Sequence, residues 1–322
     1  MTRLTLCVVL LLACGDSDPS APDSGAADAN PSADGPTADA APAVDPLDGI
    51  GVVELVSTLP TPNGGATPFT EGPVWNSTSA TLLFSDIPNT TIQQLTLPNT
   101  VAPFRQPSGR ANGLVFDGGG LLLAAEHEGR RISRTQADGV IVSVADRFEG
   151  LRFHSPNDLD VRSDGTIYFT DPPFGGNPAE LDFNGLFRIA TDGTVVDEVR
   201  YPQTARPNGV GLSPDETTLY MADTTGVVLS YDVAADGSLS NEQTFNDTLV
   251  DGADGLAIDS AGNIWITTAD GIDVFAPSGA HWGTVTVPQR PANCTFGGAD
   301  KKTLFITARD SLYRVEVVVA GL

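Results

Sequence analysis

Residues 167–171 read Ile-Tyr-Phe-Thr-Asp, an aromatic and β-branched run of the kind that forms a strand. A turn rich in Asp, Gly, Asn or Ser precedes it, and the same pattern returns five more times. The other runs are Leu82–Asp86, Leu122–Glu126, Leu219–Asp223, Ile264–Thr268 and Leu304–Ala308. Aligned on their second residues, the six runs are 40, 45, 52, 45 and 40 residues apart. A period of roughly 40–50 residues with short strands is typical of β-propeller blades.

The sequence therefore predicts an all-β fold over residues 49–322, a six-bladed β-propeller with four antiparallel strands per blade. An irregular sandwich would not space its strands so evenly, and no helix-length amphipathic segment supports an α/β fold. Runs at Val52–Val56 and Leu312–Val317 flank the repeats. We expect these two runs to pair and close the ring, because closure removes exposed strand edges.

The N-terminal residues predict export. Residues 1–14 contain Arg3, an apolar run from Leu4 to Ala13 and then Cys14, which is the pattern of a secretory signal. Leu-Leu-Ala-Cys at 11–14 resembles the lipobox of bacterial lipoproteins, in which the cysteine is lipidated; a plain signal peptide is the alternative. Residues 15–48 contain eight aspartates and neither Lys nor Arg, so they predict a disordered acidic linker. We expect a cell-envelope protein, facing the periplasm or the exterior and held to the membrane only through this anchor.

Charge and cysteine content restrict the possible partners. The chain has 41 acidic and 17 basic residues, a net charge of −24, which argues against binding nucleic acid or an anionic lipid surface. Cys294 is the one cysteine outside the leader, so the folded part has no intramolecular disulfide. We expect Cys294 to be a buried apolar side chain rather than a nucleophile, and the protein to be a monomer or weak oligomer.

An oxygen-bearing side chain precedes each aligned strand residue by 11 or 12 positions. The six are Glu71, Asn112, Asn157, Asn208, Asp254 and Asn293, and glycine follows four of them. The first strand of each blade lines the central channel, so equivalent positions should point at one axis. Asn-Gly and Asp-Gly pairs also occur as simple turns, but six polar residues in phase with the repeat favour a site.

Hard oxygen donors indicate which metal such a ring would bind. Calcium takes six to eight oxygen ligands in flexible geometry, and two of the six ring residues are anionic. No Cys or His occupies a ring position, which argues against a soft metal. The ring therefore predicts one divalent cation, Ca²⁺ first, with Mg²⁺, Mn²⁺ and Zn²⁺ as alternatives. Ring residues that do not bind the metal would contact substrate or water.

Longer stretches resemble the SMP-30/gluconolactonase family, also called regucalcin-like. They are Glu71–Trp75, Ser155–Asp158, Ile167–Gly175, Arg206–Gly209, Asp223–Thr224, Asp254–Asp259 and Asn293–Gly298. The resemblance runs in order through residues 50–318 and implies a six-bladed propeller, one divalent cation and lactone hydrolysis. The family's metal ligands match Glu71, Asn208 and Asp254, and Asn157 matches a second asparagine at the metal or the substrate. Sugar-acid-binding animal members carry arginine where this chain has Ser155, which puts sugar-lactone specificity in doubt.

The predicted activity is gluconolactonase-like: metal-dependent hydrolysis of a small lactone to its hydroxy acid. The metal would act as a Lewis acid on the carbonyl, which stabilises the oxyanion formed when water attacks. The resemblance favours Asp254 as general base, and His127 is a rival because its loop should return to the ring face. Candidate substrate-binding residues are Asn112, Asn157, His154 and Asn293.

Other functions fit the same residues. An arylesterase or organophosphate hydrolase would use every ligand named above, and pocket shape would decide between them. A non-catalytic surface propeller that binds calcium is a third interpretation, because a fold alone does not establish a function. A strictosidine-synthase-like propeller is a more distant one, since that chemistry is not expected to need a metal ring.

Overall fold

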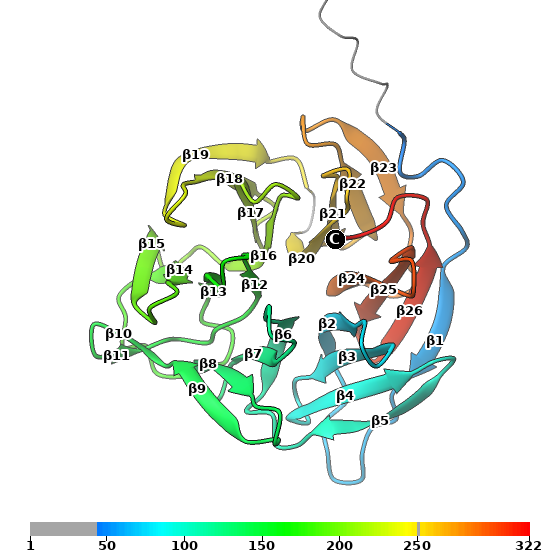
Figure 1. Cartoon of the computed structure of the whole chain (residues 1–322). Coiled ribbons are helices and arrows are strands. Elements are labelled where there is room, and N and C mark those ends of the chain that lie inside the picture. The colour runs from blue at the N-terminus through cyan, green and yellow to red at the C-terminus, as the bar shows by residue number, and fades with distance from the viewer. Residues whose placement is uncertain (1–43, 250–251) are drawn as a thin grey trace, which may run out of the picture. The chain divides into compact units, whose positions relative to one another are not determined.

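The computed structural model describes residues 44–249 and 252–322, which form a six-bladed β-propeller without helices in the described part (Figure 1). The predicted leader, Cys14 and most of the predicted linker lie outside the described residues. The last part of that linker is described, and Leu47 packs on an apolar cluster of the final blades, so the packed chain starts ahead of residue 49. No helix in the described part is long and apolar enough to cross a membrane.

Each blade is a four-stranded antiparallel sheet whose first strand lies nearest the axis (Figure 1). The first blade contains β2 (Thr70–Asn76), β3 (Thr81–Asp86), β4 (Thr91–Thr96) and β5 (Thr100–Arg105). The second contains β6 (Ala111–Phe116), β7 (Leu122–Glu126), β8 (Arg131–Thr135) and β9 (Ile141–Ala145). The third contains β12 (Leu159–Val161), β13 (Ile167–Asp171), β14 (Asn184–Ile189) and β15 (Val195–Tyr201). A small hairpin, β10 (Arg147–Phe148) with β11 (Leu151–Arg152), joins the second blade to the third.

The second half of the chain repeats this order. The fourth blade contains β16 (Pro207–Leu212), β17 (Thr218–Asp223), β18 (Val228–Val233) and β19 (Leu239–Asn246). The fifth contains β20 (Ala253–Ile258), β21 (Ile264–Thr268), β22 (Ile272–Phe275) and β23 (His281–Val285). The sixth contains β24 (Asn293–Gly297), β25 (Thr303–Ala308) and β26 (Ser311–Glu316), with β1 (Glu54–Thr58) as its outer strand. The six runs used to predict the repeat are the second strands of the six blades.

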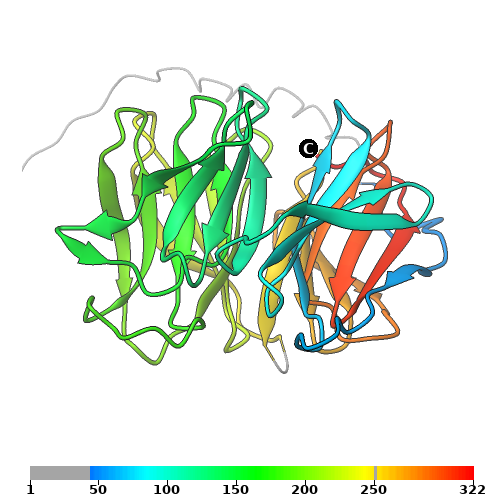
Figure 2. The ribbon, with the colours of Figure 1, turned by 90° about the horizontal axis from the view of Figure 1, so that it is seen from below.

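Pairing of the two chain ends closes the ring, as predicted. Strand β1 pairs antiparallel with β26, with Glu54 opposite Arg314 and Thr58 opposite Ser311. The last blade is thus built from both ends of the folded chain, and its outer edge is the N-terminal strand. Figure 2 shows the strands running between the two ends of the propeller, which carry the turns and loops.

The apolar core lies between neighbouring blades rather than on the axis. In one cluster Phe169 and Phe187 stack with ring centroids 5.3 Å apart and pack against residues of the second blade. In another, Trp75 stacks on Phe305 of the last blade at 5.5 Å. Offset aromatic pairs of this kind add about 0.5–1.5 kcal/mol beyond the burial of their area. Packing between blades fixes the inner strands, and the inner strands carry the ring residues.

Candidate metal centre and its surroundings

The six predicted ring residues occupy equivalent places in the six blades. Five of them are the first or second residue of an inner strand, in β2, β6, β16, β20 and β24. Asn157 lies two residues ahead of β12. Their side chains are buried or nearly so: Asn157 is 1 % exposed, Asn293 is 6 % exposed, and Asp254 is partly buried. The structure therefore brings together the residues that the spacing selected.

Four of the ring side chains form a directed chain of hydrogen bonds. Asn112 Nδ2 donates to Asn157 Oδ1, and Asn157 Nδ2 donates to Asn208 Oδ1, each over 2.7 Å. Asn208 Nδ2 then donates to Asp254 Oδ1, also over 2.7 Å. An ionised carboxylate only accepts, so Asp254 fixes the orientation of the three amides. At the far end, Asn112 Oδ1 is buried and has no hydrogen-bond partner.

Negative charge is concentrated at this ring. Burial, together with the charge of Asp254, raises the pKa of Glu71 well above its usual value, although the Gly72 N–H opposes the shift. Burial also raises the pKa of Asp254 to about 6, against the hydrogen bond from Asn208. A cation between these carboxylates would oppose both shifts, because a nearby positive charge favours the ionised form.

Asp158 is a third buried carboxylate that the sequence reasoning missed. Burial raises its pKa to about 7, and its Oδ2 accepts a 3.2 Å hydrogen bond from Asn293 Nδ2. It also faces an axial cavity of about 240 Å³ that reaches Leu322 at the end of the chain. The available signal was the departure of Asn157-Asp158 from the Asn-Gly pattern seen at two other ring positions.

Glycine follows four ring residues because the neighbouring blade touches the chain there. A β-carbon at Gly72 would overlap the carbonyl oxygen of Asn112, and one at Gly255 would overlap the side chain of Asn293. At Gly209 it would lie 2.5 Å from the carbonyl oxygen of Asp254. These glycines are therefore contacts between blades, rather than the simple turns that the dipeptides allow.

Hydroxyl groups of the second strands hold the inner strands in place, and sequence reasoning missed them. Ser85 Oγ donates to the Asn112 carbonyl over 2.7 Å, Thr170 Oγ1 to the Asn208 carbonyl over 2.7 Å, and Thr307 Oγ1 to the Asn293 carbonyl over 3.1 Å. Thr267 Oγ1 of the fifth blade lies 3.0 Å from the Gly255 carbonyl and 2.8 Å from the Ala292 carbonyl, next to ring residues Asp254 and Asn293. The signal was present, since Ser or Thr is the fourth residue in four of the six aligned runs.

His127 adjoins the ring, as its predicted place after β7 requires. Its Nε2 lies 3.0 Å from Asn157 Oδ1, which already accepts from Asn112. The bond therefore calls for a proton on Nε2, and leaves Nδ1 as the acceptor. Burial lowers the pKa of His127 to about 4, so the imidazole is neutral near pH 7.

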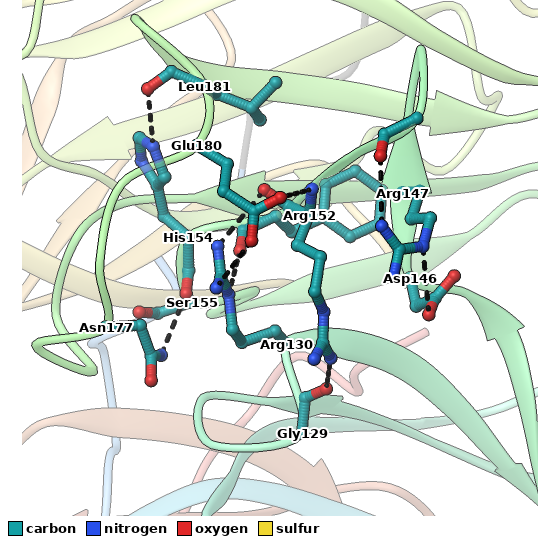
Figure 3. Close-up of polar contacts among 12 residues, drawn as sticks. Gly129, Arg130, Asp146, Arg147, Arg152, His154, Ser155, Asn177, Glu180 and Leu181 are labelled. Carbon is teal, nitrogen blue, oxygen red and sulfur yellow. Dashed lines mark hydrogen bonds and ion pairs between the residues drawn. The ribbon is translucent and has the colours of Figure 1, made fainter.

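The imidazole of His154 makes its hydrogen bonds to the loop that follows β13 and to β14, and to none of the six ring residues. Its Nδ1 lies 3.0 Å from Asn184 Oδ1 and its Nε2 lies 3.0 Å from the Leu181 carbonyl, with the ring pointing at Leu181 in Figure 3. The imidazole is 3 % exposed. Both nitrogens are used within the protein, so the structure gives His154 a place in loop packing, and substrate binding by it stays a prediction.

Ser155 is covered by the loop that follows β13. Its side chain is fully buried, and its Oγ accepts a 2.7 Å hydrogen bond from Gly175 N. Asn177 ties the same loop to the carbonyls of His127 and His154 over 2.8 and 3.0 Å. The loop thus lies against the ring face, at the place predicted for a pocket wall.

The donor set fits a hard cation such as Ca²⁺. It consists of oxygens only, it contains an amide oxygen with no partner, and its carboxylates are buried close to each other. Within residues 44–249 and 252–322, His, Cys, Asp and Glu alone make no group of three that could hold a metal. A cation here would therefore depend on asparagine oxygens as well as on Glu71 and Asp254.

Cys294 is buried at 3 % exposure, and burial raises the pKa of its thiol. Its Sγ lies 3.8 Å from the Trp265 carbonyl oxygen, and the charges of Asp158 and Glu71 add to the effect of burial. A thiol in such surroundings stays protonated and is a poor nucleophile, as the sequence suggested.

Known proteins resemble this chain over most of its length. Residues 69–310 match the SMP-30/Gluconolactonase/LRE-like region. A gluconolactonase of Zymomonas mobilis is 32% identical over 289 residues, covering 79% of this chain and 80% of the relative. Regucalcin of Xenopus laevis is 26% identical, covering 74% and 82%. The solved structure of a gluconolactonase from Xanthomonas campestris superposes with a TM-score of 0.73 at 31% identity, covering 79% of this chain and 88% of that one.

Proposed function

Because this chain belongs to the SMP-30/gluconolactonase/LRE-like family, we propose that it opens a small lactone to the hydroxy acid with the help of one divalent cation, Ca²⁺ first. The chain is a lactonase, a hydrolase of carboxylic ester bonds. The two neighbouring carboxylates, Glu71 and Asp254, support the metal part of the proposal, because the charge of Asp254 adds to burial in raising the pKa of Glu71. The partnerless oxygen of Asn112 marks a further place on the ring for a ligand. A buried polar atom without a partner is costly, and a cation or a bound substrate would satisfy it.

Glu71, Asn157, Asn208 and Asp254 would hold the cation. The two carboxylates balance a double positive charge, and the two amides add neutral oxygens, which leaves further coordination positions to substrate and water. When bound, the cation supplies Lewis-acid polarisation of the lactone carbonyl and stabilises negative charge on its oxygen. Asn112 and Asn293 complete the ring and would contact the substrate.

Asp254 is the residue we assign as general base. Its Oδ1 is held by Asn208, so Oδ2 is the oxygen that can take the proton of the attacking water. His127 has a different place, because its Nε2 is engaged with Asn157 Oδ1 and holds that amide in position. We therefore assign His127 a positioning role at the ring.

The experiment that tests the proposal is hydrolysis of a panel of lactones by the full chain, followed by acid release. The protein is first chelated and then assayed again with Ca²⁺, Mg²⁺, Mn²⁺ or Zn²⁺. Turnover that disappears on chelation and returns with one cation is the expected result. Full turnover after complete chelation would refute the metal role, and no turnover with any lactone would refute the reaction.

We also propose that the protein is exported and held at the cell envelope through lipid on Cys14. The apolar run ending in Leu-Leu-Ala-Cys and the acidic residues that follow support this placement. Radioactive palmitate should label the wild-type protein and fail to label Cys14→Ala. If both proteins partition to membranes equally, the anchor is elsewhere.

A further inference from the structure

Two arginines beside the ring have no partner, in a chain where acidic residues are abundant. The chain has 41 Asp and Glu against 15 Arg. Among the described residues, the guanidinium groups of Arg110 and Arg309 alone make neither a hydrogen bond nor an ion pair. Arg110 Nε is buried as well. The other described arginines each have at least one partner, such as Arg188, whose Nε lies 2.6 Å from Glu198 Oε1. Arg110 is half-buried and Arg309 is exposed.

Both arginines are placed at the ring by their backbones. The carbonyl oxygen of Arg110, two residues ahead of Asn112, accepts the N–H of His127 over 3.1 Å. The carbonyl oxygen of Arg309 accepts the N–H of Thr70 over 2.6 Å, next to Glu71. The two residues have φ of 55° and 54°, a left-handed conformation that costs a non-glycine residue about 1–2 kcal/mol. Arg110 stands just ahead of β6 and Arg309 lies in the turn between β25 and β26, so the two residues flank the first blade from its two neighbours.

The charges of these arginines reach the ring side chains. The guanidinium of Arg110 contributes to the lowered pKa of His127, after burial. The charges of Arg290 and Arg309 act in the same direction on Asp254, where burial is the larger and opposite effect. The charge of Arg110 therefore acts on His127 and that of Arg309 on Asp254, in a protein of net charge −24.

We propose that Arg110 and Arg309 bind an anionic group on the lactone, so that the substrate carries a carboxylate, a phosphate or a sulfonate. The inference rests on the proposed function, because it names the substrate class of the same site. A guanidinium without a partner offers up to five N–H donors in a planar fork, which matches the oxygens of such anions. Ring carboxylates alone would repel an anionic substrate, and the arginines remove that barrier.

A matched pair of lactones tests the proposal. D-glucaro-1,4-lactone has a carboxylate where D-glucono-1,4-lactone has a hydroxymethyl group, and the 6-phosphate and 6-sulfonate of gluconolactone extend the comparison to other anions. We expect the wild-type protein to prefer an anionic lactone by about tenfold or more in kcat/KM. Arg110→Gln and Arg309→Gln should each reduce this preference by about 10- to 100-fold, the range for charge-assisted hydrogen bonds. Arg110→Lys should restore part of it, and 1 M NaCl should weaken it.

Arg200→Gln is the control, because it removes one positive charge from an exposed position on β15 and leaves Arg110 and Arg309 in place. It should leave the preference as in the wild type. A preference that neither Arg110→Gln nor Arg309→Gln changes would overturn the proposal. An equal loss of kcat/KM on the neutral and the anionic lactones would overturn it too. That second result would mean that the arginines only adjust the ring carboxylates.

A binding measurement separates this inference from the proposed function. Calorimetric titration with D-glucarate and with D-gluconate needs no turnover. If no lactone is hydrolysed but glucarate binds and Arg110→Gln abolishes that binding, the reaction is wrong and the anion site stands. If neutral lactones are hydrolysed with metal and no anion is preferred, the reaction stands and the anion site is wrong.

Discussion

Replacing Glu71 by glutamine should make the metal-free protein more stable, and should remove most of the stabilisation that Ca²⁺ gives. Glu71 is 4 % exposed, and burial and the charge of Asp254 raise its pKa. The folded state therefore holds the proton of Glu71 more tightly than the unfolded state does, so the metal-free wild-type fold loses stability as pH rises, and a neutral isostere of equal size does not. The gain in stability from Glu71→Gln should therefore be larger at pH 8 than at pH 5.

The metal response can be given a magnitude. A cation at 100 times its dissociation constant stabilises a protein by about 2.7 kcal/mol, and a domain of this size gains roughly 2–4 °C in melting temperature per kcal/mol. The wild-type shift should then be about 5–10 °C. If loss of one carboxylate ligand weakens binding about 100-fold, the same cation concentration gives about 0.4 kcal/mol, or about 1 °C.

The assay is thermal unfolding of the chelated protein, with and without Ca²⁺, at pH 5 and pH 8. Glu198→Gln is the matched control, because Glu198 is a buried carboxylate that lies 2.6 Å from Arg188 on the outer part of the third blade. Breaking a buried pair on one side costs about 3–5 kcal/mol, so this variant should melt earlier yet keep the full calcium shift. If Ca²⁺ raises the melting temperature of Glu71→Gln as much as that of the wild type, Glu71 is not a ligand. A lower melting temperature of metal-free Glu71→Gln at pH 8 would refute the burial argument.

Three further outcomes are expected. Gly72→Ala should lower the free energy of unfolding in urea by about 3 kcal/mol or more, because the new β-carbon overlaps the next blade and the φ of residue 72 is 47°. Gly118 has open space around its Cα, so Gly118→Ala should change that free energy by less than about 0.5 kcal/mol. Asp254→Asn should lower kcat by at least about 100-fold, and His127→Gln, which keeps a donor, by about tenfold; the reverse order would transfer the base to His127. Metal-free protein should lose stability as pH rises from about 4 to 7, because the folded state holds the proton of Asp158, whose pKa is about 7, more tightly than the unfolded state does. A melting temperature that rises over that range would contradict the last of these.

The repeat was readable in the sequence because every blade solves the same packing problem. A run such as Ile167–Asp171 is a second strand buried on both faces, so its apolar residues are constrained in all six copies. Closure by β1 was predictable for a related reason, since a three-stranded last blade would expose β26. Strand ends were harder: β1 begins at Glu54, not at Val52, because the hydropathy of one edge strand does not fix its register.

The sequence predicts the site residues that recur once per blade, and it does not predict those that occur only once. The ring residues recur once per blade, so six weak signals add up. Asp158 occurs once, so its departure from the Asn-Gly pattern is a single weak signal, and it does not show that the side chain faces the axial cavity. Arg110 and Arg309 were missed for another reason. Whether an arginine is paired depends on which acids fold next to it, which no local pattern contains.

Ser155 shows how far the family comparison can carry specificity. The missing arginine at that position put sugar lactones in doubt, on the assumption that residue 155 faces the substrate. In the structure its Oγ is the acceptor that fastens Gly175, and a long side chain there would have to displace the loop. Positive charge has not left the ring, however, because Arg110 stands two residues ahead of Asn112 as residue 155 stands two ahead of Asn157. The same register in the neighbouring blade supplies the guanidinium, so the substrate group that it binds should enter from the side of the second blade.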